Sequence, residues 1–173
     1  MNLIVAVDTD WGIGYKGDLL ARVREDLRNF AKVTSGKIVV YGTNTLATFP
    51  GGKVLKNRIN IILNPSPDFK VEGAIVANSL DDLFKKLESY NKEDIFVIGG
   101  ASVYNQLLPY CTKAYVTKFD KSFDKDTYIP NLDESDDWIC VYESEEFRTN
   151  PETDTGGDFS FKFTIYEKTG KTK

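Results

Sequence analysis

The chain has 173 residues, of which 41% are hydrophobic and 28% are charged, as is usual for a globular protein of one domain. Its 22 Lys and Arg residues against 26 Asp and Glu residues give a net charge of −4, which argues against a nucleic-acid-binding groove. Histidine is absent from the sequence, which excludes histidine-based triads, proton relays and metal sites. No run approaches the length of a membrane span and none resembles a signal peptide, so we expect a cytoplasmic protein without a membrane partner.

Short apolar runs alternate with helical patterns along the first part of the chain. The runs are residues 3–7, 38–41, 59–63, 74–77 and 95–98. The helical patterns are residues 25–33, 43–49, 79–90 and 102–108. Nearly continuous apolar runs are typical of strands buried on both faces of a parallel sheet. This alternation predicts an α/β fold with right-handed crossovers.

The C-terminal part has a different pattern. Residues 113–119, 138–146 and 159–167 are expected to form strands, with no long helix between them. In the last of these segments, aromatic and polar residues alternate, which favours an antiparallel strand at the edge of the sheet. The sequence therefore predicts a single domain over residues 1–173, with a mainly parallel sheet of about eight strands, an antiparallel C-terminal strand and four flanking helices.

Asp26 is the most informative residue of the chain. It shares one side of the predicted helix with Leu27 and Phe30, and we expect that side to face the protein. A carboxylate among apolar neighbours needs a partner or holds a proton, which indicates a site that binds a polar heterocycle or donates protons. The alternative is an Asp26 at the helix edge that interacts favourably with the helix dipole.

Two glycine-containing turns, residues 41–45 and 98–102, each join an expected strand to an expected helix. The free N–H groups of a helix N-terminus favour a phosphate, and adjacent glycines let a ligand approach the backbone closely. The two turns together predict a diphosphate site, to which Thr43 and Thr45 contribute hydroxyl donors. Ordinary helix capping is the alternative for each turn. Neither turn has the GxGxxG pattern of a standard dinucleotide-binding fold.

Taken in order, a series of motifs resembles the dihydrofolate reductase family from residue 1 to about residue 130. The motifs are Ile4-Val5-Ala6, Gly12-Ile13-Gly14, Asp26-Leu27 with Phe30, Gly42 with Thr45, Leu55 with Arg58, residues 60–63, Ile98-Gly99-Gly100 with Tyr104, and residues 115–117. The resemblance implies an oxidoreductase that transfers hydride from NADPH to C6 of 7,8-dihydrofolate and protonates N5. The tetrahydrofolate formed would support one-carbon and thymidylate metabolism.

The resemblance also implies roles for individual residues. Asp26 would hydrogen-bond the pterin and link to Thr117, and Arg58 would bind the glutamate carboxylate of the substrate. The implied catalytic residues are Asp26, Thr117, Leu19 and Tyr104. The implied substrate-binding residues are Ile4, Val5, Asp26, Leu27, Phe30, Phe49, Leu55, Arg58, Ile98 and Thr117. We expect desolvation to raise the pKa of Asp26.

For the cofactor, the resemblance implies NADPH bound across the two glycine turns, under a flexible loop of residues 14–20. The implied cofactor-binding residues are Ala6, Ile13, Gly14, Gly17, Asp18, Leu19, Gly42, Thr43, Asn44, Thr45, Leu63, Asn64, Gly99, Gly100, Ala101, Ser102, Val103 and Tyr104. The Gly99–Gly100 bond is expected to be cis. The resemblance further implies a monomer that binds antifolates, without a metal ion.

Three positions depart from the family pattern. Leu20-Ala21 replaces a common Pro-Trp pair, Thr43 replaces a basic residue that often binds the adenosine 2′-phosphate, and Asn64-Pro65 replaces hydroxyl or guanidinium donors. These departures leave NADH open as the cofactor. Two other functions also remain open, namely a related pyrimidine reductase of riboflavin synthesis and a nucleotide- or pterin-binding module without turnover.

Overall fold

The computed structural model describes residues 1–170, and the final three residues of the expected domain lie outside the described part. The main-sheet strands are β1 (Asn2–Val7), β4 (Ile38–Gly42), β5 (Ile59–Leu63), β6 (Ala74–Ala77), β7 (Ile95–Gly99), β8 (Lys113–Phe119), β10 (Trp138–Glu143), β11 (Phe147–Arg148) and β12 (Ser160–Lys168). The helices of the described chain are α1 (Arg24–Thr34), α2 (Thr43–Leu46), α3 (Leu80–Leu87) and α4 (Ala101–Leu107).

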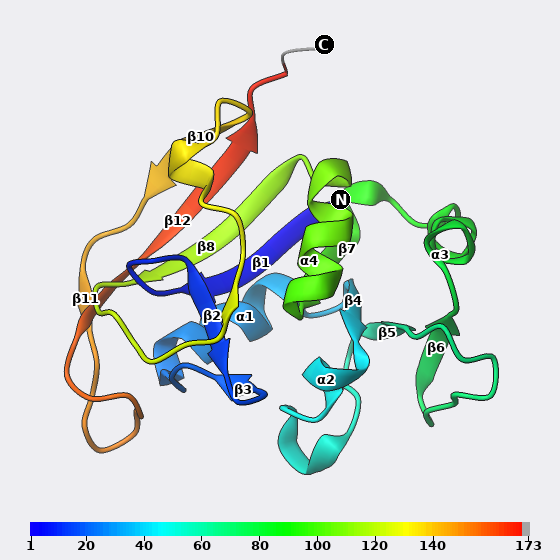
Figure 1. Cartoon of the computed structure of the whole chain (residues 1–173), viewed down its shortest axis with the longest axis horizontal. Helices are drawn as coiled ribbons and strands as arrows, with labels where there is room; N and C mark the ends of the chain where they lie inside the picture. Colours follow the sequence, from blue (N-terminus) through cyan, green and yellow to red (C-terminus); the bar gives the residue numbers. More distant parts are fainter. Residues whose placement is uncertain (171–173) are drawn as a thin grey trace.

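The main sheet has the strand order β10-β12-β8-β1-β7-β4-β5-β6, with β11 paired to β12 (Figure 1). The six strands from β8 to β6 in this order pair in parallel. Strand β12 is antiparallel to β8, and β10 is antiparallel to β12. The predicted α/β class, with its mainly parallel sheet and antiparallel C-terminal strand, is confirmed.

Alternate residues along each strand enter two cores on opposite faces of the sheet. Leu3 and Val5 pack with Leu83 of α3 and Leu107 of α4. Ile4, between them in the sequence, belongs to a second cluster. That cluster also contains Val39, Tyr41, Ile62, Phe96 and Ile98, with Phe30 and Val33 of α1 and Leu46 of α2 packed against it. Helices thus cover both faces, which explains why the central strands are apolar throughout.

A small second sheet was not predicted. Strands β2 (Gly12–Tyr15), β3 (Asp18–Leu19) and β9 (Thr127–Tyr128) form it in the order β3-β2-β9. Residues 14–20, expected to form a flexible loop, therefore contain most of a hairpin whose turn has Lys16 and Gly17 at positive φ. Strand β9 lies more than one hundred residues later in the chain, and its two residues carry no recognisable strand pattern.

Other boundaries differ by a few residues. Helix α2 ends at Leu46 rather than at residue 49, because the N–H groups of Thr48 and Phe49 bond to the carbonyls of Thr45 and Leu46 in tighter turns that precede Pro50. Helix α3 begins as expected, with the Ser79 side chain accepting a hydrogen bond from the N–H of Asp82 at 3.0 Å.

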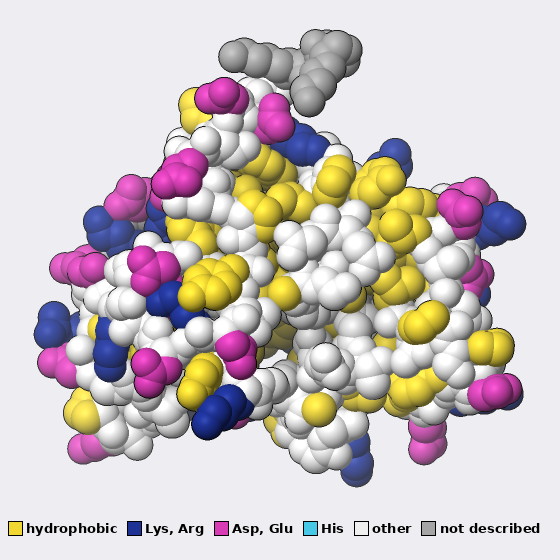
Figure 2. All heavy atoms as spheres, in the orientation of Figure 1, with side chains coloured by type: hydrophobic (Ala, Val, Ile, Leu, Met, Phe, Trp, Pro, Cys, Tyr) yellow, Lys and Arg dark blue, Asp and Glu magenta, His cyan; other side chains and the backbone are white. Residues whose placement is uncertain are grey.

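The surface carries both charge signs. Figure 2 shows Lys and Arg side chains interspersed with Asp and Glu on the face that it displays. Within residues 1–170, none of the helices combines the length and the apolar character needed to cross a bilayer.

Candidate active site

Helix α1, which packs on one face of the sheet, and strand β8 bring Asp26 and Thr117 together. The Thr117 hydroxyl donates a hydrogen bond to Asp26 Oδ1 at 2.6 Å, although the two residues are 91 positions apart. Desolvation raises the pKa of Asp26 from its ordinary value of 3.8 to about 6, and the hydrogen bond from Thr117 opposes this shift. The expected direction of the shift is confirmed. A carboxyl group with a pKa near 6 can exchange protons close to neutral pH.

The neighbours of Asp26 on α1 are less buried than expected. Phe30 is partly buried and packs against the core under α1. Leu27 is 44% exposed, so the expectation that it packs inward is wrong. At 100° per residue, the position after Asp26 turns away from the sheet by more than a quarter of a turn. The side chain of Leu27 therefore offers an apolar surface beside the carboxylate.

Arg58 lies at the far end of α1 from Asp26. Its guanidinium donates to the Thr34 hydroxyl at 3.2 Å and to the Lys56 carbonyl at 2.8 Å, and it lies 6.0 Å from the ring centre of Phe30. These contacts hold a partly buried cation above an aromatic ring. Such a group suits an anionic end of a ligand whose ring system contacts Phe30.

Phe49 and Leu55 are partly buried against the same core cluster as Phe30. Phe49 packs edge-on against Tyr41 with ring centres 5.1 Å apart. The Asn60 side chain accepts from the N–H of Leu55 at 3.0 Å and donates to its carbonyl at 2.8 Å, and it also accepts from the Tyr41 hydroxyl at 2.9 Å. Sequence reasoning missed this positioning role of Asn60. The signal was a polar residue inside the apolar run of β5.

Tyr104 connects α4 to β1. Its hydroxyl donates to the Ile4 carbonyl at 2.7 Å, and burial raises the pKa of Tyr104 well above its usual range, so the hydroxyl stays protonated. Ile4 and Ile98, two of the implied substrate-binding residues, come from the adjacent parallel strands β1 and β7. Val5 packs its side chain into the core on the α3 and α4 face, opposite to Ile4.

The two glycine turns meet at the carboxyl ends of β4 and β7. A Cβ atom on Gly99 would come within 3.0 Å of the Thr45 hydroxyl, and one on Gly42 within 3.2 Å of Val103 Cγ2. The Gly99–Gly100 peptide bond is cis, as expected. Ala101, Ser102 and the buried Val103 begin α4 directly after this bond.

The remaining expected cofactor residues lie on both sides of these turns. The Asn64 side chain, just after Leu63 and the end of β5, donates to the Thr43 hydroxyl at 2.9 Å, whereas Asn44 is exposed. In the β2–β3 hairpin, Gly14 is buried and Gly17 is exposed, while Ile13 packs partly against the main core. Asp18 pairs with Arg22 at 3.0 Å, and Leu19 is 42% exposed. Ala6 is partly buried against a cluster that contains Ala21, Val23, Phe119, Phe159 and Phe161.

Comparisons with known proteins give the family. A sequence model described as dihydrofolate reductase matches residues 1–168. The chain is 35% identical to the dihydrofolate reductase of Bacillus subtilis, over all of this chain and 97% of that protein. It is 32% identical to that of Staphylococcus haemolyticus, over 97% of this chain and 95% of that protein.

The chain belongs to the dihydrofolate reductase family. A solved dihydrofolate reductase from Enterococcus faecalis, complexed with NADP(H) and RAB-propyl, superposes with a TM-score of 0.80. It is 27% identical, and the match covers 97% of this chain and 95% of that one. Dihydrofolate reductases catalyse the NADPH-dependent reduction of dihydrofolate to tetrahydrofolate, and this chain is an oxidoreductase of that kind.

Leu20-Ala21, which replaces the Pro-Trp pair common in the family, lies beside a cluster of phenylalanines. Ala21 is buried in a cluster with Val23. The aromatic members of the cluster are Phe119, Phe159 and Phe161, with Phe123, Phe147 and Phe163 partly buried against them. In this dihydrofolate reductase, phenylalanines from β8, β12 and the neighbouring loops therefore pack where the segment leading into α1 passes the sheet.

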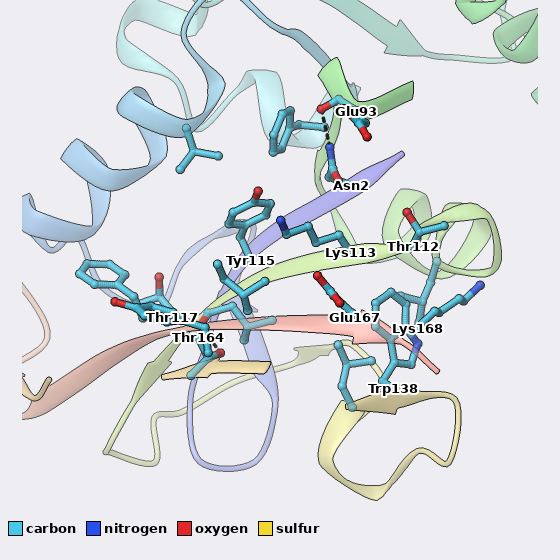
Figure 3. Close-up of a pocket in the computed structure, with 18 of the residues that line it drawn as sticks. Asn2, Glu93, Thr112, Lys113, Tyr115, Thr117, Trp138, Thr164, Glu167 and Lys168 are labelled. Carbon is cyan, nitrogen blue, oxygen red and sulfur yellow. Dashed lines mark hydrogen bonds between the residues drawn. The ribbon is translucent and has the colours of Figure 1, made fainter. Parts of the chain in front are cut away.

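A groove with a volume of about 1570 Å³ is lined by residues of α1, β8 and β12, among them Thr117, the hydrogen-bond partner of Asp26 (Figure 3). It runs along β8 and β12, past Tyr115, Lys113 and Glu167, towards Trp138. Of the four catalytic residues that the sequence implied, only Thr117 lines this groove. Its volume does not identify the groove as the active site, whereas the ionisable group with a raised pKa and its hydroxyl partner indicate the site on α1.

Proposed function

We propose that the chain reduces 7,8-dihydrofolate to 5,6,7,8-tetrahydrofolate, with hydride added at C6 and a proton at N5, and that Asp26 and Thr117 are the central residues of the site. The observation that carries this proposal is the 2.6 Å hydrogen bond between a desolvated carboxyl group on α1 and a buried hydroxyl group on β8. A pterin amidine presents two donors to such a carboxylate.

In this proposal, Asp26 binds and orients the pterin, and its pKa near 6 favours protonation at N5. The walls around the pterin and benzoyl groups are Ile4, Leu27, Phe30, Phe49, Leu55 and Ile98, whereas Val5, whose side chain enters the core on the other face of the sheet, would contribute only its backbone. Arg58 binds the carboxylate of the glutamate tail, and its stacking beside Phe30 fixes the direction of the guanidinium. Leu19 and the β2–β3 hairpin exclude water from the reacting atoms.

The two glycine turns fit a dinucleotide. The space beside Gly99 would be filled by a Cβ atom 3.0 Å from the Thr45 hydroxyl, so glycine leaves room for a ligand close to the backbone. NADPH supplies the hydride when it is bound there. Ala6, Ile13 and Tyr104 would contact its nicotinamide, and Thr45 with residues 99–102 its diphosphate. Thr43, Asn44 and Asn64 would lie towards its adenosine.

We further propose that the chain acts as a cytoplasmic monomer of one domain, with dihydrofolate and antifolates as its small-molecule partners. Mixed charge on the displayed face and a net charge of −4 support the absence of a nucleic-acid partner. The continuity of one sheet from β10 to β6 supports the single domain.

The test is NADPH oxidation by the purified protein with dihydrofolate, beside Asp26→Asn and a matched control, Glu25→Gln. Glu25 is the adjacent residue of α1, is exposed and pairs with Arg28 at 3.0 Å, so its change alters a carboxylate without touching the site. We expect rapid oxidation in the wild type and the control, and a large loss in Asp26→Asn. Equal rates in all three proteins would contradict the role of Asp26.

Two further arms separate the alternatives. The departures at Thr43 and Asn64 are the reason for testing NADH beside NADPH. Faster oxidation of NADH than of NADPH would overturn the assignment of NADPH as the cofactor. Folded protein that binds NADPH but oxidises it neither with dihydrofolate nor with a pyrimidine substrate would indicate a binding module. Oxidation with the pyrimidine alone would indicate the riboflavin-type reductase.

A further inference from the structure

Helix α1 has no capping side chain of its own. Its N-cap residue is Val23, which makes no side-chain hydrogen bond to the helix. The first regular bond runs from the N–H of Leu27 to the Val23 carbonyl at 2.9 Å, which leaves the N–H groups of residues 24–26 without intrahelical acceptors. Asp26 is the third residue of this first turn. The direction of its carboxylate therefore depends on how the turn is held.

One of the missing acceptors, that for Arg24, comes from the loop between β11 and β12. Asp154 Oδ1 accepts a hydrogen bond from the N–H of Arg24 at 2.9 Å, across 130 positions of sequence. The Thr155 hydroxyl accepts from the N–H of Arg22 at 2.8 Å, and the N–H of Thr155 donates to the Arg22 carbonyl at 3.1 Å. Three hydrogen bonds thus join this loop to the two residues on either side of Val23.

Hydrogen bonds within the loop orient the Asp154 carboxylate towards α1. Asp154 Oδ2 accepts from the N–H of Asn150 at 2.8 Å, and the N–H of Asp154 donates to the Asn150 carbonyl at 2.8 Å. Partial desolvation opposes ionisation, but hydrogen bonds from the N–H groups of Arg24 and Asn150 hold the pKa of Asp154 below its usual range. The carboxylate is therefore charged at neutral pH, which is favourable at a helix N-terminus.

The backbone of the loop also packs directly on the segment before α1. Gly156 has a φ of 90°, and a Cβ atom there would lie 2.8 Å from Cβ of Ala21. Lys121 donates a hydrogen bond to the Gly156 carbonyl and so holds this contact from the β8 side. Glycine at residue 156 and alanine at residue 21 together permit the close approach.

We propose that Asp154, supported by Thr155, is the N-terminal cap of α1 and a positioning residue that keeps the Asp26 carboxylate in contact with Thr117. The part that concerns Asp26 rests on the proposed function, whereas the cap belongs to the fold. An unrestrained first turn can rotate, and a small rotation lengthens the 2.6 Å bond that joins α1 to β8. Loss of this hydrogen bond would change both the orientation and the pKa of the Asp26 carboxyl group.

The experiment compares the wild type with Asp154→Ala, Asp154→Asn and the matched control Asp158→Ala. Asp158 is on the same loop, 72% exposed, and pairs with Arg148 at 3.1 Å. Three quantities are measured, namely amide hydrogen exchange at Arg24, the pKa of Asp26 by carboxyl NMR, and single-turnover hydride transfer to dihydrofolate across pH.

In Asp154→Ala, we expect faster exchange at Arg24, a shifted Asp26 titration, and a rate of hydride transfer that falls by roughly threefold to tenfold, the range that corresponds to losing a helix cap. The KM for NADPH should change by less than about twofold, since the hydrogen bonds of Asp154 go to Arg24, Asn150 and Thr153 and none reaches the glycine turns. Asp154→Asn keeps an acceptor oxygen and should recover most of the rate. Asp158→Ala should match the wild type.

Unchanged exchange at Arg24 in Asp154→Ala would refute the cap. Lower thermal stability with unchanged hydride transfer and an unchanged Asp26 pKa would refute the positioning role. If Asp154→Ala does not fold, Thr155→Val replaces it, because valine keeps the side-chain shape of threonine but lacks the hydroxyl that accepts from Arg22. Amide exchange at Arg22 and the Asp26 titration are then measured in that variant. If the wild type fails to reduce dihydrofolate, the proposed function fails, while exchange and the Asp26 titration still decide the cap.

Discussion

Ionisation of Asp26 should control both activity and stability, with opposite consequences for Asp26→Asn. Burial raises the pKa of Asp26 to about 6, against 3.8 for an exposed aspartate. This difference of about two units corresponds to roughly 3 kcal/mol between the protonated and charged forms. The protonated carboxyl group is therefore the form that the fold prefers.

The sign for stability follows from proton binding. Between pH 4 and pH 6 the folded protein holds a proton that the unfolded chain has released, so the free energy of unfolding falls as pH rises through this window. The stabilisation present below about pH 4 is lost above about pH 6. Asparagine at this position does not ionise and still offers Thr117 an acceptor. We expect Asp26→Asn to exceed the wild type in stability at pH 7 by as much as ~3 kcal/mol, and to match it near pH 4.

Activity should change in the opposite direction. The pH profile of kcat/KM for dihydrofolate reports the free enzyme, so the wild-type value should fall about tenfold per pH unit above about pH 6. Asp26→Asn should be flat and slower by roughly a hundredfold or more. Stopped-flow measurement of NADPH consumption and urea denaturation, both from pH 4 to pH 8, provide the two curves. A wild-type profile that stays flat, or an Asp26→Asn protein less stable than wild type at pH 7, would refute the reasoning.

Three further changes test other contacts. Arg58→Met should raise the KM for dihydrofolate by roughly tenfold to a hundredfold, as expected for the loss of a charge-assisted hydrogen-bonded pair. The KM for a pterin substrate without the glutamate tail should not change. Equal effects on both substrates would contradict the assignment of Arg58 to the glutamate carboxylate. Lys125→Met leaves the fully buried Asp8 carboxylate without its cation at 2.6 Å, and urea denaturation should show a loss of about 3 kcal/mol or more, whereas an unchanged midpoint would refute the importance of this pair. Tyr104→Phe removes the donor to the Ile4 carbonyl and should cost about 1–2 kcal/mol in the same assay, with a loss below experimental error counting against it.

The amino-acid sequence by itself determined the strands and helices that carry strong periodicity. Apolar runs mark β5 and β6 at their observed bounds, and Ser79 marks the start of α3, because burial on both faces and helix capping are local properties of the chain. The order of the family motifs also located the residues of the candidate site, including Asp26 and Thr117.

Tertiary structure alone decided which distant groups meet. The cap of α1 by Asp154, the bond from Tyr104 to Ile4 and the pairing of β2 with β9 join residues about one hundred positions apart or more. No local period encodes such partners, since each bond depends on the distance and direction that the whole sheet imposes on two side chains or edges. The exposure of Leu27 has the same origin, because the packing of α1 on the sheet, and not the apolar character of the residue, sets which side of the helix is covered.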